Sequence, residues 1–285
     1  MELLTRELPP NHDLVIWGDT HLGSAACSLD TVAAIVKRVK SNKFTYTAHL
    51  GDAVEAKLVD SPHFSHEVHD ARKTPIVQIT EWCNLVRGIP SDRWLCLNTG
   101  NHEKKHFRFG DLTRLACENI GAPYGGFTAK HRIINAKTGL PMYKMLTTHG
   151  SKIANSTSPD PVVRRKIMQS QVKRSLAVLG HADCVLNFAG HGHKLLVTKP
   201  MFEPFLMDNG KSITGHYTEA NHSEGWIDES LRWYGMCGTQ HRTVVLGACT
   251  YSELAGYGVA QLGYIEVKVR GGAVMEVNEI HLGHV

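Results

Sequence analysis

Five short polar clusters occur in order along the chain, and each carries side chains that commonly bind metal ions. The clusters are Gly18-Asp19-Thr20-His21, Gly51-Asp52, Gly100-Asn101-His102-Glu103, Thr148-His149-Gly150 and Gly190-His191-Gly192-His193. The candidate ligands are two carboxylates, one amide oxygen and four imidazoles, namely Asp19, Asp52, Asn101, His21, His149, His191 and His193. Calcium prefers oxygen ligands alone, so this mixture favours manganese, iron, zinc or nickel.

The number of donors indicates two ions rather than one. Seven ligands are too many for a single four-coordinate site, but they fit two ions if one carboxylate bridges. Paired ions about 3.5–4 Å apart are used in phosphoryl chemistry, where they bind phosphate oxygens, supply a hydroxide near neutral pH and offset negative charge. The sequence therefore predicts two divalent metal ions, with manganese favoured in vitro, and a phosphoester substrate.

The clusters follow apolar stretches that read as strands, mostly behind a glycine. Strands are predicted at residues 14–17, 44–50, 94–97, 143–147 and 184–188, and helices from Asp30 and over 72–87, 112–119 and 161–179. This alternation favours an α/β core, in which ligands gather beyond the carboxyl ends of strands. If extended geometry persists there, residues two apart point the same way. Two pairs would then each aim at one centre: Asp19 with His21, and His191 with His193.

The rest of the chain gives weaker signals. The first ten residues are predicted to be a loose leader, and residues 200–242 an irregular segment. A hairpin is predicted around residues 137–139. Closing strands are predicted at 244–246, 263–269 and 274–280.

Length and composition bound the class of protein. With 285 residues, of which 42% are apolar, the chain can form one large domain. It has no run of eighteen apolar residues, so no membrane span is expected, and its first residues do not resemble a signal peptide. Its seven cysteines are scattered and odd in number, which favours reduced thiols and a cytoplasmic location. The net charge of +4 is compatible with an anionic substrate.

The order of the clusters resembles the calcineurin-like metallophosphoesterase superfamily, over residues 18–193. The resemblance implies an α/β fold, a four-layer double β-sheet sandwich flanked by helices. The residues themselves predict a single domain over residues 11–285, with an irregular insertion or lid at 200–242. The resemblance also implies that one metal is held by Asp19, His21, Asp52 and His193. The other is then held by Asp52, Asn101, His149 and His191, so that Asp52 bridges. By the same resemblance, His102 protonates the leaving oxygen.

One position departs from the family pattern. Three residues after Asp52, where the family usually has an aspartate that orients the catalytic histidine, this chain has Glu55. Its longer arm is predicted to reach His102, so Glu55 is a second candidate catalytic residue.

The motifs also bear on the subclass. Protein phosphatases of this superfamily continue the second cluster with Asp-Arg-Gly, whereas this chain continues with Ala53-Val54-Glu55-Ala56 and lacks the phosphate-binding arginine. The first cluster is similar to that of DNA-repair exonucleases. A basic stretch in the helix predicted from Pro161 contains Arg164, Arg165, Lys166, Lys173 and Arg174. It could track a nucleic-acid backbone, although an ordinary solvated face is slightly favoured. A phosphodiesterase, with nucleic acid as a candidate substrate, is therefore favoured. The alternatives are a phosphomonoesterase and a non-catalytic metal-binding scaffold.

Three features stay open at this point. The group His63, His66, Glu67 and His69 is a solvated segment or a rim of the site, with the first favoured. The cations Lys104, Lys105 and Arg108 grip a substrate phosphate or are merely exposed. Residues 200–242 form a lid or a subunit contact.

Overall fold

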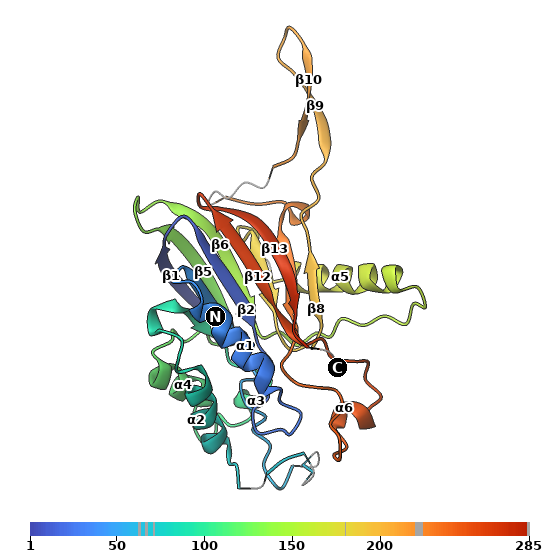
Figure 1. The fold of residues 1–285 in the computed structure, drawn as a ribbon. Helices are drawn as coiled ribbons and strands as arrows, with labels where there is room; N and C mark the ends of the chain where they lie inside the picture. The colour runs from blue at the N-terminus through green and yellow to red at the C-terminus, as the bar shows by residue number, and fades with distance from the viewer. Residues whose placement is uncertain (62–63, 66–67, 71, 180, 220–224, 284–285) are drawn as a thin grey trace.

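Two stacked β-sheets form the centre of the protein (Figure 1). The computed structural model describes residues 1–61, 64–65, 68–70, 72–179, 181–219 and 225–283. One sheet has five strands in the order β13-β12-β2-β3-β4, and the other has six in the order β1-β5-β6-β7-β11-β8. Their bounds are β1 Glu2–Leu8, β2 His12–Trp17, β3 Thr45–His49, β4 Trp94–Leu97, β5 Thr128–Asn135, β6 Pro141–Thr148, β7 Leu186–Ala189, β8 Leu195–Thr198, β11 Trp233–Cys237, β12 Gly263–Arg270 and β13 Ala273–His281.

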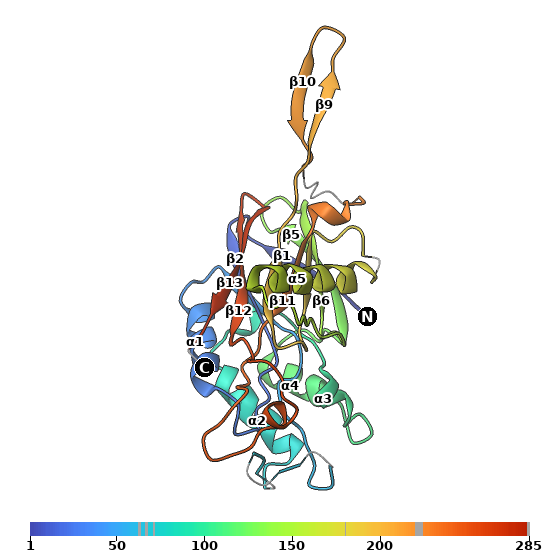
Figure 2. The ribbon, with the colours of Figure 1, turned by 90° about the vertical axis from the view of Figure 1, so that its right-hand side faces the viewer.

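Helices cover the outer faces of both sheets (Figures 1 and 2). Their bounds are α1 Leu29–Lys40, α2 Pro75–Val86, α3 Asn101–Lys104, α4 Leu112–Ile120, α5 Pro161–Ala177 and α6 Tyr251–Leu254. Helices α1, α2 and α4 bury side chains such as Ile35 and Trp82 against the five-stranded sheet. Helix α5 packs Val172 and Leu176 on the six-stranded sheet. A third apolar core lies between the sheets. The predicted four-layer α/β sandwich is therefore confirmed.

Parallel strands point their carboxyl ends toward one edge of the sandwich. In the five-stranded sheet β2, β3 and β4 run parallel, and in the six-stranded sheet β6, β7 and β11 do so. The loops after the two sets meet, because the amide of His191 donates to the carboxylate of Asp19 at 3.0 Å. All five polar clusters of the sequence follow these strands, so both sheets contribute to one site.

The prediction of a loose leader is wrong. Residues Glu2–Leu8 form β1, which pairs in parallel with β5 at the edge of the six-stranded sheet. Alternate side chains of β1 are half-buried, and these include both Leu4 and Arg6. The inward face is therefore of mixed polarity, which hides the alternation that marks a strand.

Residues 200–242 are also more regular than predicted. They contain a hairpin of β9 (Pro204–Asp208) and β10 (Ile213–Tyr217), followed by β11 inside the six-stranded sheet. The strand predicted at 244–246 is absent from this described segment, where Val244 and Leu246 are exposed. An apolar run alone does not distinguish a buried strand from an exposed loop.

Two other expectations concern thiols and membranes. All seven cysteines are free, and six of them are buried, in agreement with reduced thiols. Within the described residues, every helix is too short or too polar to serve as a membrane-spanning segment.

Candidate metal centre

The backbone of the ligand loops is left-handed rather than extended. Residues Asp19, His21, Asp52, His191 and His193 have φ of 52°, 50°, 51°, 69° and 50°. The expected extended geometry is therefore wrong, although the side chains of each pair still converge. Non-glycine residues in this region cost on the order of 1–3 kcal/mol each. Such strain persists where surrounding structure enforces it, and it typically marks a functional site.

Hydrogen bonds from two other loops hold the first loop in this conformation. The amide of Asp19 donates to Gly51 O at 2.9 Å, and the amide of His21 donates to Asp52 O at 3.0 Å. From the other sheet, the Thr239 hydroxyl donates to Asp19 O at 2.8 Å. The pairing of β2 and β3 thus continues beyond the strands and fixes the ligands.

Two glycines let the loops approach each other. A Cβ added at Gly51 would lie 2.7 Å from Gly100, and one added at Gly100 would lie 2.0 Å from Asp52 Oδ1. The buried carboxylate of Glu103 accepts hydrogen bonds from the amides of Asp52 and Gly100 at 3.1 and 2.8 Å. The cluster Gly100-Asn101-His102-Glu103 therefore supports the Asp52 loop as well as supplying Asn101.

The donor atoms form two groups. In the first, His21 Nε2 lies 3.2 Å from His193 Nε2, and His193 Nε2 lies 3.5 Å from Asp19 Oδ1. In the second, Asn101 Oδ1 lies 2.8 Å from both His149 Nε2 and His191 Nδ1. Metal ligands about 2.1 Å from an ion are roughly 3.0–3.4 Å apart in octahedral or tetrahedral geometry. Both groups fit a metal ion at close to these spacings.

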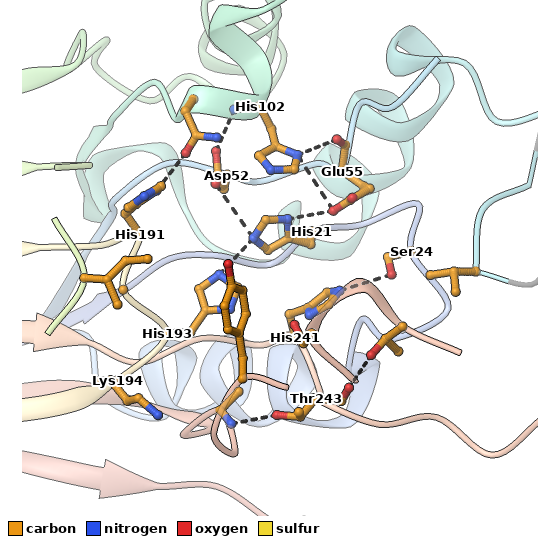
Figure 3. Close-up of a pocket in the computed structure, with 18 of the residues that line it drawn as sticks. His21, Ser24, Asp52, Glu55, His102, His191, His193, Lys194, His241 and Thr243 are labelled. Carbon is orange, nitrogen blue, oxygen red and sulfur yellow. Dashed lines mark hydrogen bonds and ion pairs between the residues drawn. The ribbon is translucent and has the colours of Figure 1, made fainter. Parts of the chain in front are cut away.

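One carboxylate oxygen lies between the two groups (Figure 3). Asp52 Oδ2 is 3.7 Å from His21 Nε2 in the first group and 3.3 Å from His149 Nε2 in the second. Its other oxygen, Oδ1, accepts a hydrogen bond from the amide of His102 at 2.9 Å. All seven ligands expected from the sequence are thus brought together, with Asp52 in the middle.

Hydrogen bonds on the far side of two rings select the tautomer. His149 Nδ1 lies 2.8 Å from Leu50 O, and His21 Nδ1 lies 2.8 Å from Glu55 Oε2. Each Nδ1 therefore carries a proton and donates it, so Nε2 is the nitrogen that faces the centre and can bind a cation when it carries no proton.

Carboxylates and imidazoles balance charge in the cluster. Burial raises the pKa of Asp52, but His149 and His102 lower it more, so it lies well below its ordinary value. Burial disfavours protonated His149, but the Asp52 carboxylate outweighs it and raises the pKa of His149 to about 9. At neutral pH and without a cation, His149 thus carries a second proton beside an ionised Asp52. A cation bound here would displace that second proton.

Glu55 contacts His102 more closely through its backbone than through its side chain. Its backbone carbonyl, 2.6 Å from His102 Nδ1, accepts the hydrogen bond that orients the His102 ring. Its carboxylate is 3.8 Å from His102 and instead accepts from His21 at 2.8 Å. The same carboxylate contacts Lys57 at 2.6 Å. This leaves His102 Nε2 to face the site. The Glu55 side chain instead supports His21, a candidate metal ligand.

A cavity of about 540 Å³ opens over the cluster. Lys57, Lys105 and Lys194 line it together with apolar Ile153 and Ala260. Of the cations that follow His102, Lys105 reaches the cavity, whereas Lys104 lies 5.5 Å from the ring of Phe127. The volume is in the range of pockets that bind small molecules.

Sequence reasoning missed His241, which follows β11. Its ring lies 5.0 Å from that of His21 and 5.9 Å from that of His193, and its Nε2 is 3.1 Å from Ser24 Oγ. The signal was present, because Gly238-Thr239-Gln240-His241 is one more glycine-led polar cluster after an apolar strand. The pattern does not stand out in the sequence, because the strand before His241 lies within residues 200–242, which are predicted to be irregular.

The sequence leaves the role of a second group of histidines, residues 63–69, undecided, and one of them reaches the site. His69 Nε2 lies 3.4 Å from Glu55 Oε1, and His69 lines the cavity. The rim interpretation thus holds for His69, whereas His63, His66 and Glu67 lie outside the described residues.

The comparison with protein families agrees with this geometry. The family model for calcineurin-like phosphoesterases matches residues 12–217. A search of curated proteins found no match. Among solved structures, the chain is similar to the NAD nucleotidase NadN of Haemophilus influenzae, with 14% identity and a TM-score of 0.41. That similarity covers 95% of this chain and spans 50% of the nucleotidase chain. Because the family match extends over most of the sequence and includes every ligand cluster, this chain belongs to the calcineurin-like phosphoesterases.

Proposed function

We propose that this protein is a metal-dependent phosphodiesterase with two divalent ions. The position of Asp52 Oδ2, between His21 and His149, carries the proposal. One ion would be held by Asp19, His21, Asp52 and His193, and the other by Asp52, Asn101, His149 and His191. When bound, the ions would polarise the phosphoryl group and make a nucleophile available near neutral pH. Manganese is the ion we favour in vitro, and iron, zinc and nickel suit the same donors.

The chain's own residues supply the other parts of the reaction. His102 is held by the Glu55 carbonyl, so its Nε2 can give a proton to the departing oxygen. Lys105 and Lys194 add positive charge to the cavity wall. Lys194 is half-buried, and burial lowers its pKa from the ordinary value.

The positive charge of the cavity matches a phosphodiester substrate better than a phosphomonoester. A phosphomonoester carries a second negative charge at neutral pH, which phosphatases usually meet with arginine. The described residues that line the cavity include lysines but no arginine, and Lys57 is paired with Glu55. A singly charged diester therefore matches the available charge better.

A substrate panel tests this proposal. Metal-stripped protein should be reloaded with Mn²⁺ and offered an aryl phosphodiester, an aryl phosphomonoester, single-stranded DNA, RNA and cyclic nucleotides. We expect metal-dependent hydrolysis with the diesters ahead of the monoester. Faster hydrolysis of the monoester would make the protein a phosphatase, and no turnover with metal bound would make it a scaffold.

We expect Glu55 to act on metal affinity through His21. Replacing Glu55 with alanine removes the acceptor of the His21 Nδ1 proton, and losing such a partner typically weakens metal binding about 10–100-fold. Calorimetric titration of the stripped protein with Mn²⁺ measures this loss. Glu55→Gln is the matched control, because it keeps an oxygen that can accept from His21. Wild-type affinity in the alanine variant would mean that the carboxylate does not support the ligand.

Nucleic acid is the polymer substrate that the basic face of α5 favours. Arg165 is paired with Glu279 at 2.5 Å, so it is not available to a phosphate. Arg174, by contrast, is exposed and lines a groove whose wall, Ile153–Asn155, also belongs to the metal-site cavity. A strand bound at the metals could run over this shared wall toward Arg174.

We expect Arg174→Glu combined with Lys166→Glu to weaken cleavage of single-stranded DNA or RNA. Each lost phosphate contact should also lower the slope of log affinity against log salt by about 1. Turnover of the small aryl diester should stay unchanged. Lys137→Glu is the control, since Lys137 is exposed in the β5–β6 turn, at the opposite end of β6 from His149. Equal losses on both substrates would make the helix structural.

The cytoplasmic location stays a prediction. So does the extent of the domain over residues 11–285.

A further inference from the structure

The β9–β10 hairpin projects away from the body of the protein (Figures 1 and 2). We call residues 201–218 the arm. Its two strands pair with each other over five residues, from Ile213 with Asp208 to Tyr217 with Pro204. Within the described part of the chain, neither strand pairs with another. Both backbone edges of the arm are therefore open to a further strand.

The strands of the arm carry exposed apolar side chains, whereas its turn, residues 209–212, is polar. Along paired strands, alternate residues share a face. One face carries Leu206, Ile213 and Tyr217, which are 76%, 71% and 66% exposed. The opposite face carries Phe205 and Met207. An isolated two-stranded ribbon is marginally stable in water, and an exposed apolar patch of this kind typically marks an interaction site.

A groove lies at the base of the arm. Phe202 and Tyr217 at the foot of the arm line it together with Trp233 of β11 and with Val274 and Met275 of β13. These side chains are largely apolar, and the groove volume is about 690 Å³. The two strands of the arm extend away from the body at whose edge this groove lies (Figure 1). The described part of one chain thus presents both an apolar projection and an apolar recess.

We propose that two copies of this chain dimerise by exchanging arms. In a two-fold pair whose arms lie side by side and antiparallel, the tip of each arm meets the base of the other. Each arm strand spans about 17 Å, at roughly 3.3 Å per residue, so the tip near Ile213 can reach the partner's groove. The contact is the same in both directions, which gives a closed dimer rather than a filament.

The size of the surface supports a second copy as the occupant. The arm and the other groove residues, Pro200, Glu219, Trp233 and Ala273–Met275, supply somewhat over 20 residues. One side of a standard protein interface uses about 20–30 residues. Both halves of the contact are present on a single chain, so no other protein is needed to complete it.

The arm and the metal centre lie at opposite ends of the molecule. The cavity is lined by residues of α3 and α6, which are far from the arm (Figure 1). Dimerisation should therefore leave hydrolysis of a small diester unchanged. The oligomeric state and the hydrolytic activity can therefore be tested separately.

The test is the molar mass of the full chain in solution, by light scattering after size exclusion. We expect twice the mass of one chain at micromolar concentration for the wild type. The double variant Leu206→Asp with Ile213→Asp should fall to one chain mass, with unchanged aryl diester hydrolysis or an unchanged melting temperature to show that the body is folded. Leu140→Asp, at a 65% exposed leucine in the β5–β6 turn, is the matched control and should remain dimeric.

A second variant distinguishes an arm in a groove from a contact of arms alone. Met275→Asp alters only the groove and should also give monomers. An equal mixture of this groove variant with the arm variant should recover some dimer, because one intact arm then meets one intact groove. A monomeric wild type, or an arm variant that stays dimeric, would overturn the proposal.

Discussion

Replacing His102 with alanine is expected to leave both metal groups intact but to slow hydrolysis of a dinucleotide by about 10²–10⁴-fold, the usual value of general-acid help. The effect should depend on the leaving group. An alkoxide, such as a sugar oxygen, must be protonated as it departs, whereas a nitrophenolate is stable without a proton. The same variant should therefore keep much of its activity on a nitrophenyl diester.

The structure gives the physical basis for this dependence. His102 follows Asn101 directly, and its Nδ1 is held by the Glu55 carbonyl at 2.6 Å. Its ring packs edge-on against that of His21, with centroids 4.7 Å apart. The remaining nitrogen lies at the cavity, which His102 lines. His102 is thus placed to reach substrate.

Metal content decides between the alternatives for His102. The side chain of His102 also lies in a group with those of His21 and Asp52 that could bind an ion. If manganese content falls together with activity, His102 is a ligand. If both substrates slow equally while two ions remain, His102 stabilises phosphoryl oxygens instead of protonating the leaving group. His106→Ala is a nearby control, since His106 lies outside the cavity lining and its ring donates to Ala56 O.

Replacing Asp52 with asparagine should have the second large effect. It should lose one of the two ions and reduce activity by more than the roughly 10–100-fold typical of losing a supporting partner. Asparagine keeps Oδ1, which accepts from the amide of His102 at 2.9 Å. It replaces Oδ2, which lies between the two donor groups, with an NH2 that cannot bind a cation. The loop should therefore stay folded while the bridge is lost.

Asn101→Ala is the matched comparison. It removes a neutral oxygen that contacts only His149 and His191, in the second group. We expect a smaller loss than for Asp52→Asn, measured as activity and metal content at saturating Mn²⁺. If Asp52→Asn binds two ions and keeps its activity, Asp52 does not bridge the two ions.

Much of the site follows from the sequence because its ligands obey a topological rule. Asp19, Asp52 and His149 each come just after an apolar strand, and parallel strands end at one edge. The local path of those loops does not follow from pattern. Left-handed residues such as Asp19 and His193 arise from hydrogen bonds to distant loops, which periodicity cannot reveal.

Two further features of the site have a similar cause. The predicted reach of the Glu55 carboxylate toward His102 can be judged from sequence, but the closer contact of the Glu55 backbone carbonyl cannot. His241 reaches the centre through β11, a strand whose burial depends on pairing with β7 and β8. Both features involve contacts between segments far apart in the chain.

One titration tests the central claim of a binuclear hydrolase most directly. Metal-stripped protein is loaded stepwise with Mn²⁺, and bound metal per chain is measured beside hydrolysis of an aryl phosphodiester. We predict that binding saturates at two ions per chain and that activity reaches its plateau at the same point. Saturation at one ion, or no hydrolysis with two ions bound, would contradict the account.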